Sequence, residues 1–512
     1  MRRLSPRSPP VSPSSSAEVQ LSRELDAVRP DLSPAYAAEL PGARAAVLTR
    51  LWRALAHEPL PWIVRREPTC DGLVLHLADG RRLHGPPADP YATAPYATQV
   101  FLDGRGYGRA AELVTALGVP HGAAFAAELD HSTASLALSR ADGPQDVPEP
   151  ATSWAWEQRV VDGHPYHPAC RSRPGFSVAE QLAYGPEHRP LVRLGLVPVA
   201  DGLLRGEWPS WLWDGDRPLL PVHPWQRAHV LRGAAEDGPV AHPLMNLRTL
   251  ALPDGGPHVK TALSARLTSS VRDISVSSVE TALVVSRFVE SLAERTDGLL
   301  RVTHTLGAFS AHSPDLAAMV RESPETYADA AAGEWVVPVA ALPVTGLPAS
   351  PGWLAAFTRL ALTVGLRLLD LGVALEAHGQ NLLVVLSAAG DPLRLVYRDL
   401  ADIRVSPARL ARHGIKAPEV ADRIVTDDET ALRRKLFGSL VAGTLASTAG
   451  AGRALGAALE ATTGDLPVTP DLVALREEPL HAKALTLMRL SPERPGDLWT
   501  RLPNPLVQEP AP

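Results

Sequence analysis

Residues 376–381 have the sequence EAHGQN and form a short polar segment between two apolar elements. On the N-terminal side, apolar side chains recur at helical spacing from Trp353 to Leu368, which predicts one long helix. On the C-terminal side, two runs of strand-forming residues at 382–386 and 393–397 are joined by the turn-forming sequence SAAGDP. Two such runs on either side of a short turn predict a β-hairpin. We therefore expect a helix, a polar connection and a hairpin, in that order.

The polar connection contains side chains that can bind a cation. If the segment is extended, Glu376, His378 and Gln380 share one face, because side chains alternate along a strand. Asn381 joins them only through a bulge or turn. The hairpin returns to the same end, which would bring Asp399 beside Glu376 and Asn381. Two carboxylates and an amide oxygen are hard ligands, as Mg²⁺ bound to phosphates requires. The alternative is an ordinary polar turn with solvated charges.

A second segment, residues 258–272, has the sequence HVKTALSARLTSSVR and supplies positive charge. Its first part alternates like a strand, with Lys260 on one face, and Thr268 and Arg272 follow. Lysine offers a compact charge to a phosphate, whereas arginine grips a carboxylate through two parallel hydrogen bonds. Together these side chains suit a site that holds a nucleotide and an acid. The alternative is a buried strand with charges at its edge.

Three shorter segments precede these two. Asn246, Arg248 and Thr249 place an amide, a guanidinium and a hydroxyl within four residues, which is compatible with a site or with an ordinary turn. Residues 220–226, LPVHPWQ, contain X-Pro units that stiffen the backbone and favour a rigid structural loop. Residues 163–176, GHPYHPACRSRPGF, contain a His-x-x-His pair, but no matching Cys or His pair lies nearby in the sequence for zinc.

The composition excludes several classes of protein. The chain has 512 residues, of which 45% are hydrophobic, and a net charge of -6. These values fit a globular protein of several domains and disfavour a nucleic-acid-binding surface. There are two cysteines, and the sequence has neither an apolar signal segment at its start nor an apolar run of 18 residues. We therefore expect a soluble, cytoplasmic protein with no nucleic-acid partner and no membrane partner.

Lysine and asparagine are scarce in this chain. Of the 50 basic residues, the lysines are Lys260, Lys416, Lys435 and Lys483. The asparagines are Asn246, Asn381 and Asn504. A GC-rich genome explains the bias, because its codons replace lysine by arginine and enrich alanine, proline and glycine. A lysine or asparagine that persists against this bias is therefore a better candidate for a specific role.

The chain divides into four segments by composition. We expect a disordered Pro/Ser/Arg-rich tail at residues 1–17, an N-terminal domain at 18–150, a central domain at 151–342 and a C-terminal domain at 343–512. The stretches ADGPQDVPEP and PVTGLPAS mark the last two boundaries. Helical and strand patterns are mixed, which predicts an α+β fold with a helical C-terminal region.

In their order along the chain, these segments resemble the signature of the NRPS-independent siderophore (NIS) synthetases, of the aerobactin-synthetase type. The family's motifs are GHPxHPxxKxRxGF, HPxHPWQ, SxRT, a lysine strand followed by TSxxR, EAHxQN and RD. Their counterparts here are GHPYHPACRSRPGF, LPVHPWQ, NLRT, KTALSARLTSSVR, EAHGQN and RD. The resemblance covers roughly residues 150–405 by motif. Two positions depart from the family, since Asn246 stands in place of Ser and Arg171 in place of Lys.

The resemblance implies a three-part fold likened to thumb, fingers and palm, which form a cradle. It also implies an ATP- and Mg²⁺-dependent ligase of siderophore biosynthesis and iron acquisition. In the family a carboxylic acid, often citrate, is adenylated, and an amine or hydroxyl nucleophile then displaces AMP to form an amide or ester. A homodimer is compatible with the family.

Carried over by motif, the resemblance gives each polar residue of these segments a role. The nucleotide would contact Asn246, Arg248, Thr249, Lys260, His378, Gln380 and Asn381. The carboxylate substrate would contact Thr268, Arg272, His378, His164 and His167. The Mg²⁺ ligands would be Glu376, Asn381 and Asp399. The catalytic residues would be Lys260, Arg272 and His378.

Two other interpretations are open on the sequence. The polar segment, hairpin and Asp399 loosely resemble the sites of small-molecule kinases, which would make the protein a phosphotransferase that releases ADP. The lack of a Gly-rich loop in the sequence argues against it. A non-catalytic protein with a decayed site would bind nucleotide without turnover. The joint presence of Glu376, Asn381, Asp399, Lys260 and Arg272 argues against decay.

Overall fold

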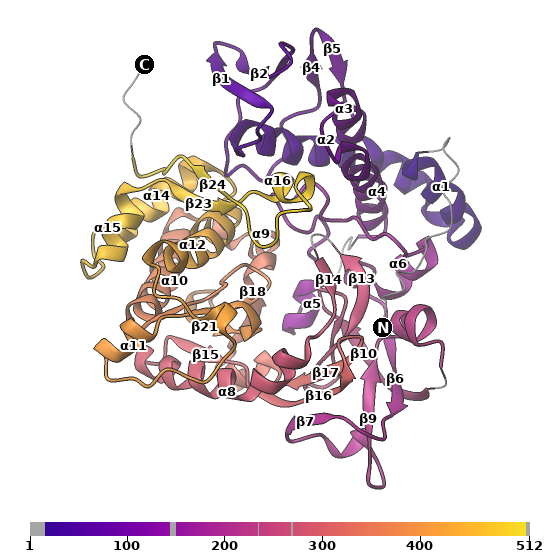
Figure 1. Cartoon of the computed structure of the whole chain (residues 1–512), viewed down its shortest axis with the longest axis vertical. Coiled ribbons are helices and arrows are strands. Elements are labelled where there is room, and N and C mark those ends of the chain that lie inside the picture. Colours follow the sequence, from indigo (N-terminus) through magenta and orange to yellow (C-terminus); the bar gives the residue numbers. More distant parts are fainter. Residues whose placement is uncertain (1–15, 144–149, 234, 268–269, 508–512) are drawn as a thin grey trace.

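Helices and sheets form three groups, which largely follow the chain, except that a strand at residues 300–302 belongs to the last group although later strands belong to the second (Figure 1). The computed structural model describes residues 16–143, 150–233, 235–267 and 270–507. Most of the predicted tail and of the first linker lies outside the described residues, although Ala17 already belongs to the first helix. In Figure 1 the N-terminal elements lie at the top, the central ones at the lower right and the C-terminal ones at the left. The mixture of helices and sheets agrees with the predicted α+β class.

The N-terminal group packs helices against an antiparallel sheet in the order β1-β2-β3-β4-β5. Pro30 follows the first helix, and Pro34 occupies the first turn of the second, where a missing backbone N–H has no cost. Trp52 and Leu55 of the second helix are buried in the core of this group. Its elements are α1 (Ala17–Val28), α2 (Ser33–His57), β1 (Ile63–Thr69), β2 (Gly72–Leu77), β3 (Arg82–Gly85), β4 (Val100–Leu102), β5 (Arg105–Tyr107), α3 (Ala110–Leu117) and α4 (Gly122–Ala141).

The central group is built on a nine-stranded sheet in the order β7-β16-β17-β12-β11-β10-β6-β9-β8. A hairpin, β13–β14, follows the inner strand β12 along the chain, and α8 packs on β16. The helices are α5 (Ser153–Glu157), α6 (Val178–Tyr184), α7 (Pro224–Gln226) and α8 (Val276–Ala293). The strands are β6 (Val192–Pro198), β7 (Leu203–Gly206), β8 (Trp213–Asp214), β9 (Arg217–Val222), β10 (Glu236–Pro243), β11 (Thr249–Ala251), β12 (His258–Thr261), β13 (Leu263–Leu267), β14 (Ser270–Arg272), β16 (Thr305–Ser313) and β17 (Leu316–Arg321).

Strand register places two cations on one face of this sheet. Lys260 of β12 lies opposite Thr249 of β11 and Met319 of β17. His258 lies opposite Arg321 in the same pair of strands. Opposite residues share a face, and so do residues two apart on one strand, so Lys260 and Arg321 are diagonal neighbours on the same face.

The C-terminal group confirms the predicted helix and hairpin. The long helix is α10 (Pro351–Leu371), and the hairpin strands β20 and β21 belong to a sheet in the order β15-β21-β20-β18. The strands are β15 (Leu300–Val302), β18 (Trp335–Pro338), β19 (Val373–Ala374), β20 (Leu382–Leu386), β21 (Pro392–Tyr397), β22 (Arg404–Val405), β23 (Leu480–Lys483) and β24 (Trp499–Leu502). The other helices are α9 (Leu342–Thr345), α11 (Pro407–Arg412), α12 (Glu429–Ser439), α13 (Ala446–Ala449), α14 (Gly452–Thr463), α15 (Pro470–Glu477) and α16 (Leu485–Leu490).

The last helix, α16, returns to the N-terminal group. Its residues Leu487 and Leu490 are buried in the same core cluster as Trp52. The buried carboxylate of Glu58 accepts hydrogen bonds from the backbone N–H groups of Thr486 and Leu487 at 3.1 and 2.7 Å. The first and last parts of the chain therefore share one core. Within the described ranges, none of the helices is long and apolar enough to cross a membrane.

Candidate active site

The EAHGQN segment is a compact turn and not an extended strand, so the alternation of side chains on one face does not apply to it. The backbone N–H groups of Asn381 and Leu382 both donate to the carbonyl of His378, at 2.8 and 3.1 Å. Gly379 explains the shape, because a Cβ at this position would lie 2.9 Å from the backbone nitrogen of Ala340. That close approach is to a residue distant in sequence, which local alternation cannot reveal. The turn still brings the Glu376 carboxylate within 4.0 Å of the His378 ring.

Asp399 lies just beyond β21 and joins this turn to the central sheet. Its carboxylate binds Nζ of Lys260 at 2.6 Å and the guanidinium of Arg321 at 3.1 Å. Burial would raise the pKa of Asp399, but the charges of Lys260 and Arg321 outweigh it and hold that pKa well below its usual range. Asp399 also has a φ of 69°, a strained backbone conformation of the kind found at functional sites.

Lys260 is almost fully enclosed. Its side chain is 5% exposed. Burial lowers the pKa of Lys260 to about 7, with the neighbouring charge of Asp399 opposing the shift. The ammonium is therefore stabilised by an adjacent anion, and a phosphate could take the place of that anion. Lys260 and Asp399 are 139 residues apart in sequence, and the structure brings them into contact.

Arg321 is a member of this cluster that no motif identified. It ends β17, where it follows five apolar residues, and its guanidinium is buried with the sheet face that carries Lys260. An arginine at the end of a buried apolar strand requires a counter-charge. The sequence could therefore indicate that Arg321 has an acidic partner, but it does not indicate that the partner is Asp399.

Arg272 and His378 lie within electrostatic reach of both carboxylates. Burial lowers the pKa of Arg272, whereas the charges of Asp399 and Glu376 oppose the shift. Burial also lowers the pKa of His378, with Glu376 and Asp399 again opposing and Arg272 adding to the effect. The third predicted contact of the carboxylate, Thr268, lies outside the described residues.

The turn at residues 246–249 is held by its own side chains. The Asn246 amide oxygen accepts from the backbone N–H of Thr249, and its amide nitrogen donates to Oγ1 of Thr249, both at 2.9 Å. Arg248 donates from Nη1 to the carbonyls of Arg272 and Asp273, both at 2.7 Å. Burial lowers the pKa of Arg248 to about 10. In this structure Asn246 shapes the turn, and Arg248 ties the turn to the base of the β13–β14 hairpin.

Two further lysines bind Glu376. Nζ of Lys435 and Nζ of Lys483 lie 3.2 and 3.0 Å from its Oε1 atom. Burial would raise the pKa of Glu376, but the charges of Lys483, His378 and Lys435 lower it on balance. Neither lysine belongs to a motif, and their segments lie 59 and 107 residues beyond Glu376 in the sequence.

The Mg²⁺ ligands predicted from the resemblance are chemically suited to the ion. Across the part of the chain that the structure describes, no three His, Cys, Asp or Glu side chains are grouped to hold a metal. The predicted set has only two carboxylates, those of Glu376 and Asp399, and an amide. The amide nitrogen of Asn381 donates to the Glu376 carbonyl at 3.4 Å, so oxygen is the ligand atom that this side chain can offer. These donors could complete a Mg²⁺ shell with phosphate oxygens and water.

The two histidines of the GHPYHP segment differ in exposure. His164 is exposed, and its Nδ1 accepts from the backbone N–H of Tyr166. Loss of hydration at its ring lowers the pKa of His164 well below its usual value, and the charges of His167 and His378 add to the effect. His167 is 1% exposed, and its Nδ1 accepts from the N–H of Ala169. His164 can therefore border the site, whereas His167 supports the loop.

Arg171 lies in a buried ion cluster and not among the site residues above. It donates to the carbonyl of Val161 at 2.9 Å and lies 3.2 Å from Glu187, which also binds Arg173 at 2.8 Å. Glu187 is fully buried. The departure from the family's lysine at this position therefore falls in a structural cluster.

Residues 220–226 form the end of β9 and the short helix α7, with His223 as the N-cap, so the prediction of a loop was wrong, although the segment does have a supporting role. The indole of Trp225 stacks on Phe176 with ring centroids 5.1 Å apart, and both belong to a core cluster with Leu263 and Leu267 of the β13 strand. Gln226 holds that strand through two hydrogen bonds to Ser264. The two motifs thus support the hairpin that carries Arg272.

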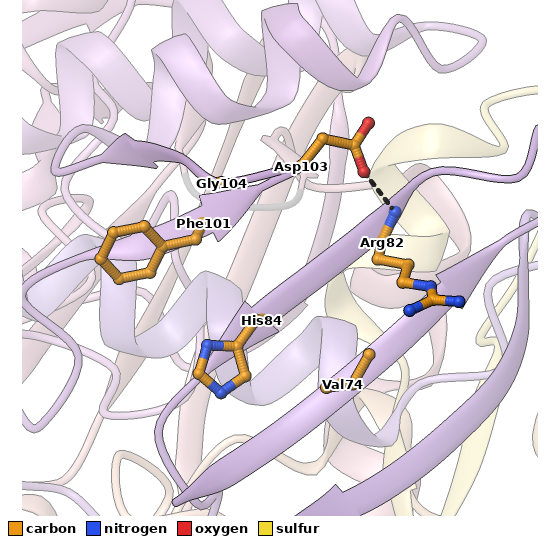
Figure 2. A pocket seen from close by; sticks show the side chains of 6 residues that line it. All are labelled: Val74, Arg82, His84, Phe101, Asp103 and Gly104. Carbon is orange, nitrogen blue, oxygen red and sulfur yellow. Dashed lines mark hydrogen bonds between the residues drawn. The ribbon is translucent and has the colours of Figure 1, made fainter.

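A separate pocket lies away from these residues. It is on the N-terminal sheet, where the Arg82 backbone N–H donates to Asp103 at 2.9 Å (Figure 2). Its lining residues are Val74, Arg82, His84, Phe101, Asp103 and Gly104. It contains none of the predicted site residues.

Comparisons with known proteins agree with the motif order. Residues 152–344 match the IucA / IucC family, and residues 352–495 match the family described as ferric iron reductase FhuF-like transporter. The N(2)-citryl-N(6)-acetyl-N(6)-hydroxylysine synthase of Escherichia coli is 25% identical over 404 residues, which cover 66% of this chain and 69% of that protein. The chain spans about half the length of several other curated relatives that it matches.

Solved structures share the fold over nearly the whole chain. The petrobactin biosynthesis protein AsbB from Bacillus anthracis has a TM-score of 0.76 at 17% identity and covers 93% of this chain and 97% of its own. The ATP-bound aerobactin synthetase IucA from Klebsiella pneumoniae has a TM-score of 0.69 at 19% identity and covers 91% of this chain and 99% of its own. The chain therefore contains a domain of the IucA / IucC family and an FhuF-like domain, and it has the fold of these solved structures.

Proposed function

We propose that this protein is an ATP-dependent ligase that adenylates a polycarboxylic acid, citrate or a relative of it, and joins it to an amine or hydroxyl nucleophile. The observation that carries the proposal is the meeting of Lys260 and Arg321 from the central sheet with Asp399 from the C-terminal group, beside Arg272 and His378. Cations for a triphosphate and a guanidinium for a carboxylate thus converge in one place. The names of the E. coli relative and of the ATP-bound structural neighbour support the same chemistry.

The first step joins two anions. An oxygen of the substrate carboxylate forms a bond to the α-phosphorus of ATP, the bond between that phosphorus and the bridging oxygen breaks, and pyrophosphate leaves. Lys260, Arg321 and Arg248 offset the repulsion and stabilise charge that develops on the phosphoryl group. Arg272 aligns the carboxylate for attack, since fixed orientation of two reactants lowers the barrier by several kcal/mol. Bound Mg²⁺ would supply further charge neutralisation at the phosphates through Glu376, Asn381 and Asp399.

The second step transfers the acyl group. The nucleophile attacks the acyl carbon, the bond from that carbon to the AMP oxygen breaks, and the nucleophile loses one proton. Burial lowers the pKa of His378, so its ring is neutral at pH 7 and able to accept that proton. The scheme has no covalent intermediate with the protein. The positioned charges stabilise the phosphoryl group, and His378 accepts the proton.

The decisive experiment traps the acyl-adenylate. The purified protein is incubated with ATP, Mg²⁺ and hydroxylamine across a panel of mono-, di- and tricarboxylic acids, and hydroxamate, AMP, ADP and pyrophosphate are measured. We expect hydroxamate and AMP with citrate or another polycarboxylate. Folded protein that forms neither AMP nor pyrophosphate with any acid would overturn the proposal, and ADP as the product would identify a phosphotransferase instead.

A further inference from the structure

Glu157 is a buried carboxylate between the two turns of the candidate site, and no motif includes it. It is the last residue of α5, and its side chain has no exposed surface. Burial removes the water that hydrates a carboxylate, and charged or hydrogen-bonding partners must compensate for that loss. The identity of those partners indicates what the side chain does.

The partners of Glu157 belong to both halves of the site. Its Oε2 accepts a hydrogen bond from the backbone N–H of Met245 at 2.9 Å, and its Oε1 pairs with Nη2 of Arg398 at 2.7 Å. Met245 immediately precedes the turn at residues 246–249. Arg398 immediately precedes Asp399, and it donates from Nε and Nη2 to the carbonyl of Gln380 at 3.0 and 2.8 Å. One carboxylate therefore connects the 246–249 turn to the 376–381 turn.

The helix that carries Glu157 is itself anchored. Trp156 is 1% exposed, and its ring lies 5.6 Å from that of Trp335 on β18. At the other end of α5, the backbone N–H of Ser153 donates to Glu325 at 2.6 Å. Figure 1 shows α5 in the middle of the molecule, between the central sheet and β18. A short helix fixed at both ends can hold a side chain in one place.

We propose that Glu157 is a positioning residue that sets the spacing between the 246–249 turn and the 376–381 turn, and thereby the geometry of the ATP-binding half of the site. This inference rests on the proposed function. Arg248 lies on the first turn and His378 on the second, so a relative shift of the turns would displace groups assigned to the nucleotide. Arg272 stands on the β13–β14 hairpin, which is bound both by Arg248 of the first turn and by Gln226, so carboxylate binding should be affected less than ATP binding but not spared.

Glu157→Gln tests the proposal with little change of shape. Glutamine can still accept from Met245, but it cannot balance the charge of Arg398. Loss of an outer partner of this kind commonly costs about 10- to 100-fold in ligand affinity or activity. We expect the Kd and KM for ATP to rise by about that factor, with the KM for the carboxylate raised by a smaller factor. Affinity is measured by titration calorimetry with ATP and Mg²⁺, and KM by pyrophosphate exchange.

Glu187→Gln is the matched control. Glu187 is equally buried and is also paired with arginines, Arg171 and Arg173, but it contacts neither turn. A general loss of stability would lower the melting temperature of both variants and leave the ATP parameters alike. Only a positioning role raises the ATP Kd of Glu157→Gln above that of Glu187→Gln. Equal ATP affinity in the two variants would overturn the inference.

A second variant guards against misfolding. Glu157→Asp retains the charge but shortens the reach, so it should fold and show an ATP Kd between wild type and Glu157→Gln. Wild-type ATP affinity in a folded Glu157→Asp protein would also count against the proposal. The affinity comparison needs no turnover, so it remains valid if the trapping experiment fails. A failed adenylation assay with the expected Kd pattern would reject the proposed function alone.

Discussion

Three of the four lysines meet at the candidate site. Lys260 pairs with Asp399, and Lys435 and Lys483 both pair with Glu376. Lysine is rare in this chain, in which most basic residues are arginine. It is found beside Asp399 and Glu376, where its compact ammonium group can approach each carboxylate closely. Arginine would present a wider, planar group there, so the two cations are not interchangeable.

We expect Lys260→Ala to lower kcat/KM for adenylation by about 100- to 1,000-fold, the usual loss when a group aimed at developing charge is removed. Lys416→Ala is the matched control, because Lys416 is exposed and is the one lysine outside this cluster. The measurement is pyrophosphate exchange, with circular dichroism to establish that both variants fold. Wild-type exchange in Lys260→Ala would remove this residue from the site.

The residues that the sequence could predict are those in local motifs. Lys260, Arg272, Glu376, His378 and Asp399 lie in patterned segments. Arg321, Lys435 and Lys483 do not, and each reaches its partner across 59 to 107 residues of sequence. No local pattern in a single sequence identifies a pair of residues so far apart.

The hairpin β13–β14 depends on an element far from it in sequence. Gln226 is fully buried at the end of α7, and its amide donates to Oγ of Ser264 at 2.8 Å and to the carbonyl of Asp315 at 3.0 Å. Its amide oxygen accepts from the backbone N–H of Ser264 at 2.8 Å. The two bonds to Ser264 fix β13, and the third ties Gln226 to the turn between β16 and β17. The next strand, β14, carries Arg272.

Gln226→Leu should weaken carboxylate binding more than ATP binding. Leucine fills the space but leaves the Ser264 and Asp315 backbone groups without partners, at a cost of about 1–3 kcal/mol each. We expect the carboxylate KM to rise by about 10-fold, with the ATP KM nearly unchanged. The result should be the reverse of Glu157→Gln, and parallel shifts in both KM values would show that Gln226 does not act through the hairpin.

Elements were predictable where their signal is local. The α10 stripe and the β20–β21 hairpin are encoded by spacing and turn residues, and both formed as expected. The EAHGQN turn was not predictable, because its shape depends on Gly379 packing against Ala340, which lies in another element.

At the scale of the whole molecule, Glu58 links the first and last parts of the chain. Burial raises the pKa of Glu58 to about 7, although the backbone N–H groups of Leu487 and Thr486 favour its ionised form. The folded protein thus holds this proton more tightly than the unfolded chain. Between about pH 4.5 and 7 the folded state binds more protons, so the contribution of Glu58 to the free energy of unfolding falls as pH rises.

We expect Glu58→Gln to remove this contribution. Relative to wild type, its free energy of unfolding should decline less between pH 5 and pH 7.5, by roughly 3 kcal/mol at most. Urea denaturation at several pH values provides the measurement. Glu477→Gln, at an exposed position on α15, is the control and should parallel wild type. Parallel curves for Glu58→Gln and wild type would contradict the shift.

The order of the nine-stranded sheet was beyond sequence reasoning. Strands β17 and β12 are neighbours although β13, β14, α8, β15 and β16 lie between them in the chain. Pairing of this kind is decided by burial of faces in three dimensions, and the periodicity of one strand does not specify its neighbour.

The return of α16 to the N-terminal core affects the order in which the protein can fold during synthesis. The core of the N-terminal group includes Leu487 and Leu490. During synthesis these residues are added after the segments that form the candidate site. Until then, part of the apolar surface of the N-terminal helices is without its packing partners. A chaperone that shields α2 and α4 on the growing chain would fit that interval, and completion of this core would coincide with completion of the site.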